Sequence, residues 1–425
     1  MTEKQIVIID PVKETIYKTF DSKKSAGEYL GINIKFLYTR LNGTYNSRNA
    51  EYPYCCIIKY LDDATPENIK KWSENCNYGL NNERRCPKCK EWKDKSEFIE
   101  SNCRPCKKKR QRAYISTEKG FFIKLACAIK SNSKRRNAKG RLDAGVCTIN
   151  SDFLIKLFNE QNGLCYYSGL PMNKQQLSNW QVSCERLDNN LGYIPSNVKL
   201  VCLEFNTGNG QWSKEKVVQI NKLINKKVNL VKLKKQIEEA KQARKPGPIK
   251  VRKEPIIKDG IELIHCTKCD KHLEKNCFTM DRKALSAYCC NCKKIKLRDY
   301  HQTMRGFLMK ICQHAEKHAL KISKNKKRSA ENSEFNLTLD NILQKIIDQK
   351  GRCAYSNIPL TFTLDSPWRL SIERTNNKKG YTIDNIVLIC IEFNTGDNSW
   401  KSDDATGSCQ WSKEKVDHFL KNMKI

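Results

Sequence analysis

One stretch of this sequence occurs twice. Residues 165–206 correspond to residues 353–394 without a gap, so that every position is displaced by 188 residues, as from Cys165 to Cys353. The shared positions are mostly polar: a Glu-Arg pair, a Gly-Tyr pair and two asparagines. A unit of this length is too long for a solenoid repeat and indicates a duplicated domain. Packing alone rarely requires such a polar set, so the repeated unit is the first place to look for chemistry.

The charge of the chain favours a polyanionic partner. It has 79 Lys and Arg against 46 Asp and Glu, a formal net charge of +33 over 425 residues. Neutralising phosphates releases condensed counterions, so such a balance is typical of nucleic-acid binding. The alternative is a Lys-, Asn- and Ile-rich composition inherited from an AT-rich genome. The basic residues are clustered rather than spread, which favours nucleic acid.

Cysteine usage indicates metal sites rather than disulfides. The chain has 22 cysteines, it begins MTEKQIVIID without a signal peptide, and eight cysteines fall into Cys-x-x-Cys pairs. This pattern in a long chain predicts metal binding in a reducing compartment. No apolar run approaches the roughly 20 residues that span a bilayer. We therefore expect a soluble, intracellular protein with no membrane partner.

The Cys-x-x-Cys pairs combine into two sites of four thiolates each. Their members are Cys86, Cys89, Cys103 and Cys106 for the first site, and Cys266, Cys269, Cys289 and Cys292 for the second. Four thiolates in two knuckles suit tetrahedral, structural zinc, because a closed site leaves no position for a substrate. Cys290 lies inside the second knuckle and is not expected to be a ligand. A redox role would need an isolated pair beside a βαβ unit.

Residues 1–75 read as a separate small module. Strands are expected at 6–10 and 15–17, a helix from Ser22 to Leu30, and a second helix over 34–41 after the turn at 31–33. Two short helices joined by a glycine turn are typical of helix-turn-helix DNA binding. In that arrangement Lys35, Tyr38 and Arg40 would face DNA, although any small α+β module could show the same pattern. The order of these residues also resembles the nuclease-associated modular DNA-binding domain.

Basic runs follow each zinc site. We expect phosphate contacts from their side chains, namely Lys107, Lys108, Lys109, Arg110, Arg112, Lys134, Arg135 and Arg136 in the first half, and Lys293, Lys294, Lys296, Arg298, Lys326, Lys327 and Arg328 in the second. A charge run is more often a solvated surface, but its repetition beside a zinc knuckle favours contact with a nucleic-acid backbone. Apolar residues at helical spacing predict a helix near 121–129.

The remaining pattern sets the domain boundaries. Amphipathic helices are expected at 153–158 and 342–347, and one long helix over 212–243, which breaks at the Pro-Gly-Pro stretch 246–248. Trp212 and Trp411, each followed by a serine N-cap, should dock the closing helices. We expect a DNA-binding module at 1–75, zinc knuckles at 80–114 and 259–300, core domains at 115–240 and 301–425, and a linker at 241–258.

Each repeated core reads as a strand ending in Glu-Arg, a Gly-Tyr turn, a second strand and a helix carrying Phe-Asn. An acid at a strand end and an amide on the following helix can converge on one divalent ion, and oxygen ligands suit Mg²⁺ or Mn²⁺. An adjacent arginine can hold a phosphate. On a very basic protein, this combination predicts phosphodiester hydrolysis.

These motifs resemble the HNH (His-Me finger) endonucleases of virus and phage type, over about residues 145–217 and 333–416. The resemblance rests on the run from Gly163 through Glu185-Arg186 and Gly192-Tyr193 to Asn206. It implies an α+β protein with tandem ββα-metal domains, each preceded by a four-cysteine zinc knuckle, behind a small α+β helix-turn-helix module. It further suggests a large DNA virus or a mobile element as the source, with the nucleus, cytoplasm, viral factory or virion as location.

The resemblance also implies roles for single residues. The metal-ligand acids are Glu185 and Glu373, the second metal ligands are Asn206 and Asn394, and the middle asparagines that orient the loop are Asn197 and Asn385. Arg186 and Arg374 stand where the family has its general-base histidine. Arginine cannot accept a proton near neutral pH. Asp188 is the candidate replacement, and its counterpart Asn376 makes the two copies unequal.

The family's internal zinc knuckle is reduced here. Cys165 is followed by Ser168 and Cys202 by Phe205, so we expect buried thiols and no zinc at these positions and at Cys353 and Cys390.

Three functions follow as hypotheses. The first is a DNA endonuclease with two structural zinc ions and catalytic Mg²⁺ or Mn²⁺, acting on double-stranded or branched DNA as a monomeric pseudo-dimer. The second is a degenerate HNH-fold protein that binds DNA without cutting, for instance in viral packaging, in the virion or in transcription. The third is a zinc-scaffolded protein–protein adaptor.

Overall fold

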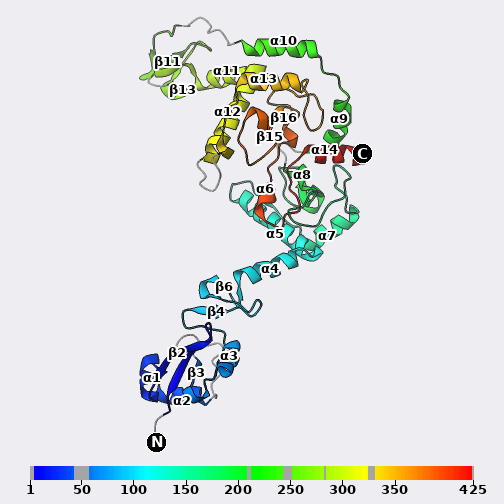
Figure 1. Cartoon of the computed structure of the whole chain (residues 1–425). Helices are drawn as coiled ribbons and strands as arrows, with labels where there is room; N and C mark the ends of the chain where they lie inside the picture. Colours follow the sequence, from blue (N-terminus) through cyan, green and yellow to red (C-terminus); the bar gives the residue numbers. More distant parts are fainter. Residues whose placement is uncertain are drawn as a thin grey trace. The chain divides into compact units, whose positions relative to one another are not determined.

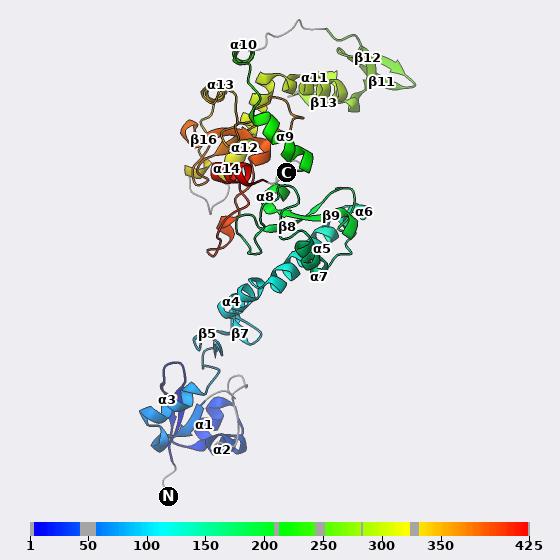
Figure 2. The same cartoon turned by 90° about the vertical axis from the view of Figure 1, so that its right-hand side faces the viewer.

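The computed structural model describes residues 4–42, 57–207, 212–242, 251–281, 284–323 and 331–423. The chain divides into two compact units, Met1–Thr117 and Glu118–Ile425. Both contain helices and sheets of two or three strands, so the fold is mixed α+β (Figures 1 and 2).

The first unit begins with a three-stranded antiparallel sheet of order β2-β1-β3. Its elements are β1 (Ile6–Asp10), β2 (Thr15–Phe20), α1 (Lys23–Leu30), α2 (Ile34–Leu41), β3 (Ile57–Tyr60) and α3 (Pro66–Glu74). The central strand β1 is buried along its whole length. Ile6 and Ile8 pack with α1 and α2, whereas Val7 and Ile9 pack with α3. Alternate side chains of this strand therefore contribute to the two hydrophobic clusters on opposite faces of the sheet.

The two helices expected over 22–30 and 34–41 are present, with the expected ends. Ser22 caps α1 by accepting a hydrogen bond from the Ser25 amide, and Gly31 ends it in the left-handed conformation with φ of 64°. Asn33 then caps α2. The expectation for Arg40 needs correction, because its side chain is only 6 % exposed. Leu37, Arg40 and Leu41 form the buried face of α2, so Arg40 does not lie with Lys35 and Tyr38 on the open face.

The rest of the first unit is the first cysteine knuckle and a basic helix. It comprises β4 (Glu83–Arg85), β5 (Trp92–Asp94), β6 (Phe98–Ile99), β7 (Asn102–Cys103) and α4 (Arg104–Ile115).

The second unit contains both repeated cores and the second knuckle. The first core comprises α5 (Glu118–Asn137), α6 (Leu142–Gly145), α7 (Ser151–Glu160), β8 (Val182–Arg186), β9 (Val198–Cys202), α8 (Leu203–Asn206), α9 (Lys214–Ile224) and α10 (Leu230–Lys241). The knuckle comprises β10 (Ile256–Lys258), β11 (Ile261–Cys266), β12 (Lys271–Glu274), β13 (Phe278–Asp281), β14 (Ala284–Cys289) and α11 (Cys290–Gln302). The second core comprises α12 (Met304–Ser323), α13 (Leu339–Asp348), β15 (Leu370–Arg374), β16 (Ile386–Cys390), the 3₁₀ turn η7 (Ile391–Phe393) and α14 (Lys413–Asn422).

The two cores repeat one pattern. In each, an antiparallel strand pair is followed directly by one helical turn, α8 or η7, that leads to the Phe-Asn motif. The helix expected over 212–243 is in fact two helices, α9 and α10. They are separated because Asn225 ends α9 and the Asn229 side chain caps α10 by accepting from the Lys232 amide. Asparagine bonds to the local backbone and favours such ends over helix interiors.

The closing helices α9 and α14 each form a buried ion pair with the opposite core. Lys216 on α9 forms an ion pair with Glu392 of the second core at 2.6 Å, and Lys415 on α14 forms one with Glu204 of the first core at 2.6 Å. All four side chains are at most 13 % exposed. The two ion pairs are therefore equivalent: each core supplies a lysine to the other and a glutamate to the other's lysine. Such reciprocal contacts are those of an isologous dimer interface.

Aromatic rings fill the junction around these ion pairs. Trp411 contacts Phe205 of the first core with ring centroids 5.3 Å apart, and reciprocally Trp212 contacts Phe393 of the second core at 5.9 Å. Trp212 and Trp411 are each 1 % exposed and contact one another. One continuous hydrophobic core therefore serves both copies. The expectation that these tryptophans dock the closing helices holds, but they also join the two copies.

The junction generates a stability prediction. Lys415→Met leaves the Glu204 carboxylate buried without its cation, which we expect to lower the free energy of unfolding by about 3–5 kcal/mol. The double variant Lys415→Met/Glu204→Gln removes both charges and should recover most of that loss. Urea unfolding of the full chain, followed by tryptophan fluorescence, measures both. Lys413→Met, which breaks the exposed pair with Asp417, is the control and should cost little. Equal losses in the single and double variants would contradict the prediction.

Candidate metal centres and candidate active site

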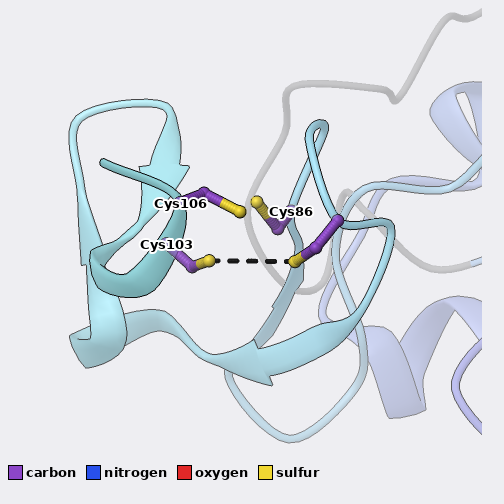
Figure 3. Close-up of side chains that lie close together, drawn as sticks. Cys86, Cys103 and Cys106 are labelled. Carbon is purple, nitrogen blue, oxygen red and sulfur yellow. Dashed lines mark hydrogen bonds between the residues drawn. The ribbon is translucent and has the colours of Figure 1, made fainter. Parts of the chain in front are cut away.

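Each set of four cysteines predicted to bind zinc converges on one point. In both clusters the four sulfur atoms lie within 4.8 Å of one another. Figure 3 shows the Cys86, Cys103 and Cys106 side chains of the first cluster pointing toward a common centre. The Sγ atoms of Cys89 and Cys103 are 3.8 Å apart. A zinc ion with Zn–S bonds of about 2.3 Å at the centre of a tetrahedron requires an S–S separation of about 3.8 Å. The residues therefore fit zinc.

The backbone builds the two clusters in the same way. The first Cys-x-x-Cys of each lies in a tight turn, completed by a non-glycine residue with positive φ, Lys90 at 64° and Asp270 at 56°. The second pair lies at the start of a basic helix, where Cys103 and Cys289 are the N-caps of α4 and α11. A helix N-terminus stabilises negative charge, which favours thiolates at this position.

One thiol in each cluster is set up to ionise. Burial tends to raise the pKa of Cys86 and of Cys266. Backbone amides, those of Cys103 and Cys89 among them for Cys86, donate hydrogen bonds that outweigh burial and lower each pKa to about 6. Zinc binds thiolates. Bound zinc would hold the two halves of each knuckle together, in a segment whose own apolar core is small.

In the first core, the strand β8 places Glu185 on a buried face, and β9 pairs with it antiparallel (Figure 2). Glu185 is 9 % exposed. The Asn206 amide nitrogen donates to the Ser183 hydroxyl at 2.7 Å and to the Cys184 carbonyl at 3.0 Å. Asn206 is thus fixed to the strand that carries Glu185, and its Oδ1 accepts no hydrogen bond from the described residues. The second core repeats this arrangement with Asn394, Ser371 and Ile372.

Arg186 and Arg374 use their guanidinium groups to hold the following loop. Arg186 donates to the carbonyl oxygens of Asn189 and Leu191 at 2.9 and 2.7 Å, and Arg374 donates to the Lys379 carbonyl and the Asn332 side chain. Arg186 is 8 % exposed. The resemblance to the HNH family implies a general base at this position. Here the position holds an arginine whose side chain closes a turn.

Asn197 and Asn385 complete the same loop. Asn197 accepts from the Asp188 amide and donates to the carbonyls of Asp188 and Gly192, at 2.8, 3.0 and 2.9 Å, and Asn385 makes the equivalent bonds. Gly192 is needed because a Cβ there would lie 2.1 Å from the Val146 carbonyl oxygen. The Tyr193 amide donates to that same oxygen. The polar residues common to both copies therefore build the loop after the Glu-Arg pair.

The two copies differ around the acid. At the second, Gln410 donates to Glu373 Oε1 at 2.8 Å; its counterpart in the first copy, Gln211, lies outside the described residues. At the first, Arg136 from α5 lies over the Tyr193 ring, 5.3 Å from its centroid, and its Nη1 is buried without a hydrogen-bond partner among the described residues. Burial raises the pKa of Glu185 and that of Glu373 to about 7. The charge of Arg186 opposes this at Glu185, and the Gln410 hydrogen bond followed by the charge of Arg374 opposes it at Glu373. The sequence did not indicate that Arg136 belongs to this site, because a helix far earlier in the chain brings it there.

Asp188 is exposed and makes a local turn. Its Oδ1 accepts from the Asn190 amide at 2.8 Å, and Asn376 of the second copy accepts from Lys378 in the same way at 2.9 Å. An amide oxygen serves this turn as well as a carboxylate does, so the turn does not account for the negative charge of Asp188.

The cysteines of the reduced knuckle are buried thiols. Cys165 accepts a hydrogen bond from the Cys202 amide at 3.3 Å, and Cys353 accepts one from Cys390. Over the described ranges, only the two four-cysteine clusters bring together three or more His, Cys, Asp or Glu side chains that could hold a metal ion.

Most predicted basic side chains lie on helices and are exposed. Lys107 to Arg112 lie on α4, Lys134 to Arg136 on the last turn of α5, and Lys293 to Arg298 on α11. Lys107 forms an ion pair with Glu100 at 3.2 Å, and Lys293 donates to Thr279. Lys326, Lys327 and Arg328 lie outside the described residues.

Comparisons with protein-family models, with curated proteins and with solved structures returned no match to this chain. Among the helices that the structure describes, none is both long and apolar enough to cross a bilayer.

The cysteine clusters predict the metal content. We expect about two zinc ions per chain, one for each cluster. Cys106→Ser and Cys292→Ser should each remove one, because three thiolates no longer close a tetrahedral site. Elemental analysis by mass spectrometry measures the content. Cys290→Ser is the matched control, since Cys290 neighbours the second cluster without belonging to it, and should keep both ions. A chain that binds no zinc, or that loses an ion with Cys290→Ser, would contradict the assignment.

The buried Glu185 predicts a pH dependence of stability. Its pKa is raised from 4.5 to about 7, so the folded chain binds this proton more tightly than the unfolded chain. The contribution is present below the unfolded pKa and is lost as pH rises through about 7. Glu185→Gln should therefore stabilise the chain relative to wild type at about pH 8, by up to about 3 kcal/mol, and much less at about pH 5.

Urea unfolding at the two pH values, without added Mg²⁺, measures this effect. Glu215→Gln is the control: a hydrogen bond from Ser213 lowers the pKa of Glu215, so its removal should destabilise the chain at the higher pH. The same difference between Glu185→Gln and wild type at both pH values would contradict the prediction.

Proposed function

We propose that this chain is a metal-dependent DNA endonuclease of HNH type, in which two nuclease-like units form a pseudo-dimer within one chain. The observation that carries the proposal is the pair Glu185 and Asn206. Glu185 is a buried acid with a raised pKa at the end of a strand. Asn206 is fixed to that strand through its amide nitrogen, and its oxygen accepts no hydrogen bond from the described residues. Together they offer two oxygen ligands. The net charge of +33 suits a phosphodiester substrate.

Glu185 and Asn206 would hold the catalytic ion, and Glu373 and Asn394 are the corresponding pair in the second unit. Mg²⁺ and Mn²⁺ prefer oxygen ligands of this kind. When bound, such an ion supplies stabilisation of the negative charge that develops on the phosphate. A carboxylate with a pKa near 7 becomes an effective ligand as pH rises through that value, because the ion competes with the proton.

The first unit is the better candidate for the chemistry. Its Asp188 keeps a carboxylate where the turn needs only an amide oxygen, as Asn376 shows in the second unit. This carboxylate, three residues after the proposed ligand Glu185, would accept the proton of the attacking water, the task that Arg186 cannot perform. Arg186 positions the loop that carries Asp188.

The reciprocal junction supports action as a pseudo-dimer. Reciprocal ion pairs and a shared core fix the two units to one another, as the subunits of an isologous dimer are fixed. The exposed basic helices that follow the zinc clusters, α4 and α11, are the proposed contacts to the DNA backbone, together with the open face of α2 that carries Lys35 and Tyr38.

The second candidate is a DNA-binding protein that does not cut. Both arginines are committed to loop carbonyls, and one of the two acids is hydrogen-bonded by a glutamine. These features suit a fold that retains its shape without the chemistry. Roles in viral packaging, in the virion or in transcription belong to this candidate.

Cleavage of supercoiled plasmid and of branched DNA, with Mg²⁺ or Mn²⁺, tests the proposal. We expect metal-dependent nicking that Glu185→Gln abolishes and that Glu373→Gln reduces only slightly. Asp188→Asn should slow cleavage by about 10²–10⁴-fold, the usual contribution of general-base catalysis, with unchanged unfolding, because the second unit folds with asparagine there. Binding to DNA that weakens with salt, without cleavage by wild type, would establish the second candidate instead.

A further inference from the structure

The first core has a pocket of about 410 Å³ close to the strand that carries Glu185, since Leu187 of its lining directly follows β8. Tyr166, Tyr167 and Leu187 line one side, and residues 212–215 at the start of α9 line the other. Leu187 lies two residues after Glu185, directly beyond the end of β8. Tyr167 is buried, and the nearby charge of Glu185 adds to the effect of burial in raising the pKa of Tyr167.

Two lysines converge on the ring of Tyr166 at this pocket. The Lys214 ammonium lies 4.2 Å from the ring centroid, and the Lys199 ammonium lies 5.4 Å from it. Lys199 is the direct cross-strand neighbour of Glu185 in the β8–β9 pair. No ion pair to a carboxylate of the described residues is formed by either lysine. Two ammonium groups near one ring, neither paired with a described carboxylate, favour the approach of an anion.

One residue of the lining also has a buried donor without a described partner. Trp212 lines the pocket, is 1 % exposed, and its indole N–H has no hydrogen-bond partner among the described residues. Its counterpart Trp411 donates to the Glu204 carbonyl at 3.3 Å. Glu215 contributes the one carboxylate of the lining, and its pKa is held low by Ser213.

The second core lacks this arrangement. At the positions of Tyr166 and Lys199 it has Ala354 and Val387, so the ring and the cross-strand lysine are lost together. The counterpart of Lys214 is Lys413, which is engaged by Asp417 at 2.9 Å. The two copies therefore differ in charge next to the acid, although they agree in the loop residues that shape it.

We infer that Lys199 and Lys214, held together by the ring of Tyr166, bind one backbone phosphate of a nucleic-acid strand beside Glu185. The first core thus positions the strand that reacts, and the second core serves as its structural partner. This inference rests on the proposed function in that Glu185 marks the reacting site, but it concerns binding and can be tested without cleavage.

The salt dependence of DNA binding by the full chain tests this subsite. The probe is fluorescein-labelled branched DNA, measured by anisotropy without added Mg²⁺ or Mn²⁺ so that no cleavage intervenes. Each neutralised phosphate contributes about 0.9 to the slope of log K against log salt concentration. Lys199→Met/Lys214→Met should lower the magnitude of the slope by about 0.9, and Lys413→Met, the matched control in the second core, should leave it unchanged.

A reciprocal variant keeps the test independent of damage to the fold. Ala354→Tyr/Val387→Lys introduces the ring and the cross-strand lysine into the second core and should increase the slope there, whereas Tyr166→Ala should lower the affinity in the first. Equal slopes for Lys199→Met/Lys214→Met and for Lys413→Met, with unfolding midpoints equal to that of wild type, would overturn the inference.

Inorganic phosphate distinguishes the source of the ligand. If it displaces the labelled DNA no better than chloride at equal ionic strength, the site recognises a strand, as we infer. If it displaces DNA more strongly from wild type than from Lys199→Met/Lys214→Met, the pocket takes free phosphate and the assignment to a strand is overturned. Unchanged slopes together with Glu185-dependent cleavage would refute the subsite alone, whereas absence of cleavage would refute only the proposed reaction.

Discussion

The crossed ion pairs between α9, α14 and the two cores are the constraint on which the second unit depends. A buried lysine or glutamate is stable only when it is paired, because its removal from water costs several kcal/mol. Lys216 meets its carboxylate on the second core, and Lys415 meets its carboxylate on the first. Without α9 or α14 of the other copy, each core would bury an unpaired glutamate and lose that free energy. The two copies are therefore held as one folding unit.

Much of the local structure could be predicted from the sequence. The serine and glycine at the ends of α1, the cysteine spacing and the apolar stripes of α7 and α13 act over a few residues, and the structure agrees with each. The break between α9 and α10 was missed because helical periodicity continues through Asn225 and Asn229, although asparagine capping could have revealed it. The burial of Arg40 depends on which face of α2 meets the sheet, which polar character alone does not indicate.

The candidate site was less predictable, because it depends on contacts between distant segments. Repetition identified Glu185, Arg186 and Asn197 as special, but their patterns are equally compatible with ligands and with loop supports. Hydrogen bonds show that Arg186 and Asn197 support the loop. Glu185 is different, because it is buried and its pKa is raised. Arg136 and the ion pairs of the closing helices with the opposite core have no local signature, since only the folded chain brings α5 to Tyr193 and α14 to the first core.

The two copies show which residues shape the unit and which are free to differ. Positions that hold the loop or the junction are identical in both, because the same hydrogen bonds and packing recur: the arginine, the middle asparagine, the glycine and the tryptophan. Positions whose differences leave these contacts intact have diverged, with Asp188 against Asn376 and Lys199 against Val387. A copy locked in place by a buried junction can lose charge at its acid without loss of fold. The charged set that remains in the first copy is therefore better explained by a ligand than by stability.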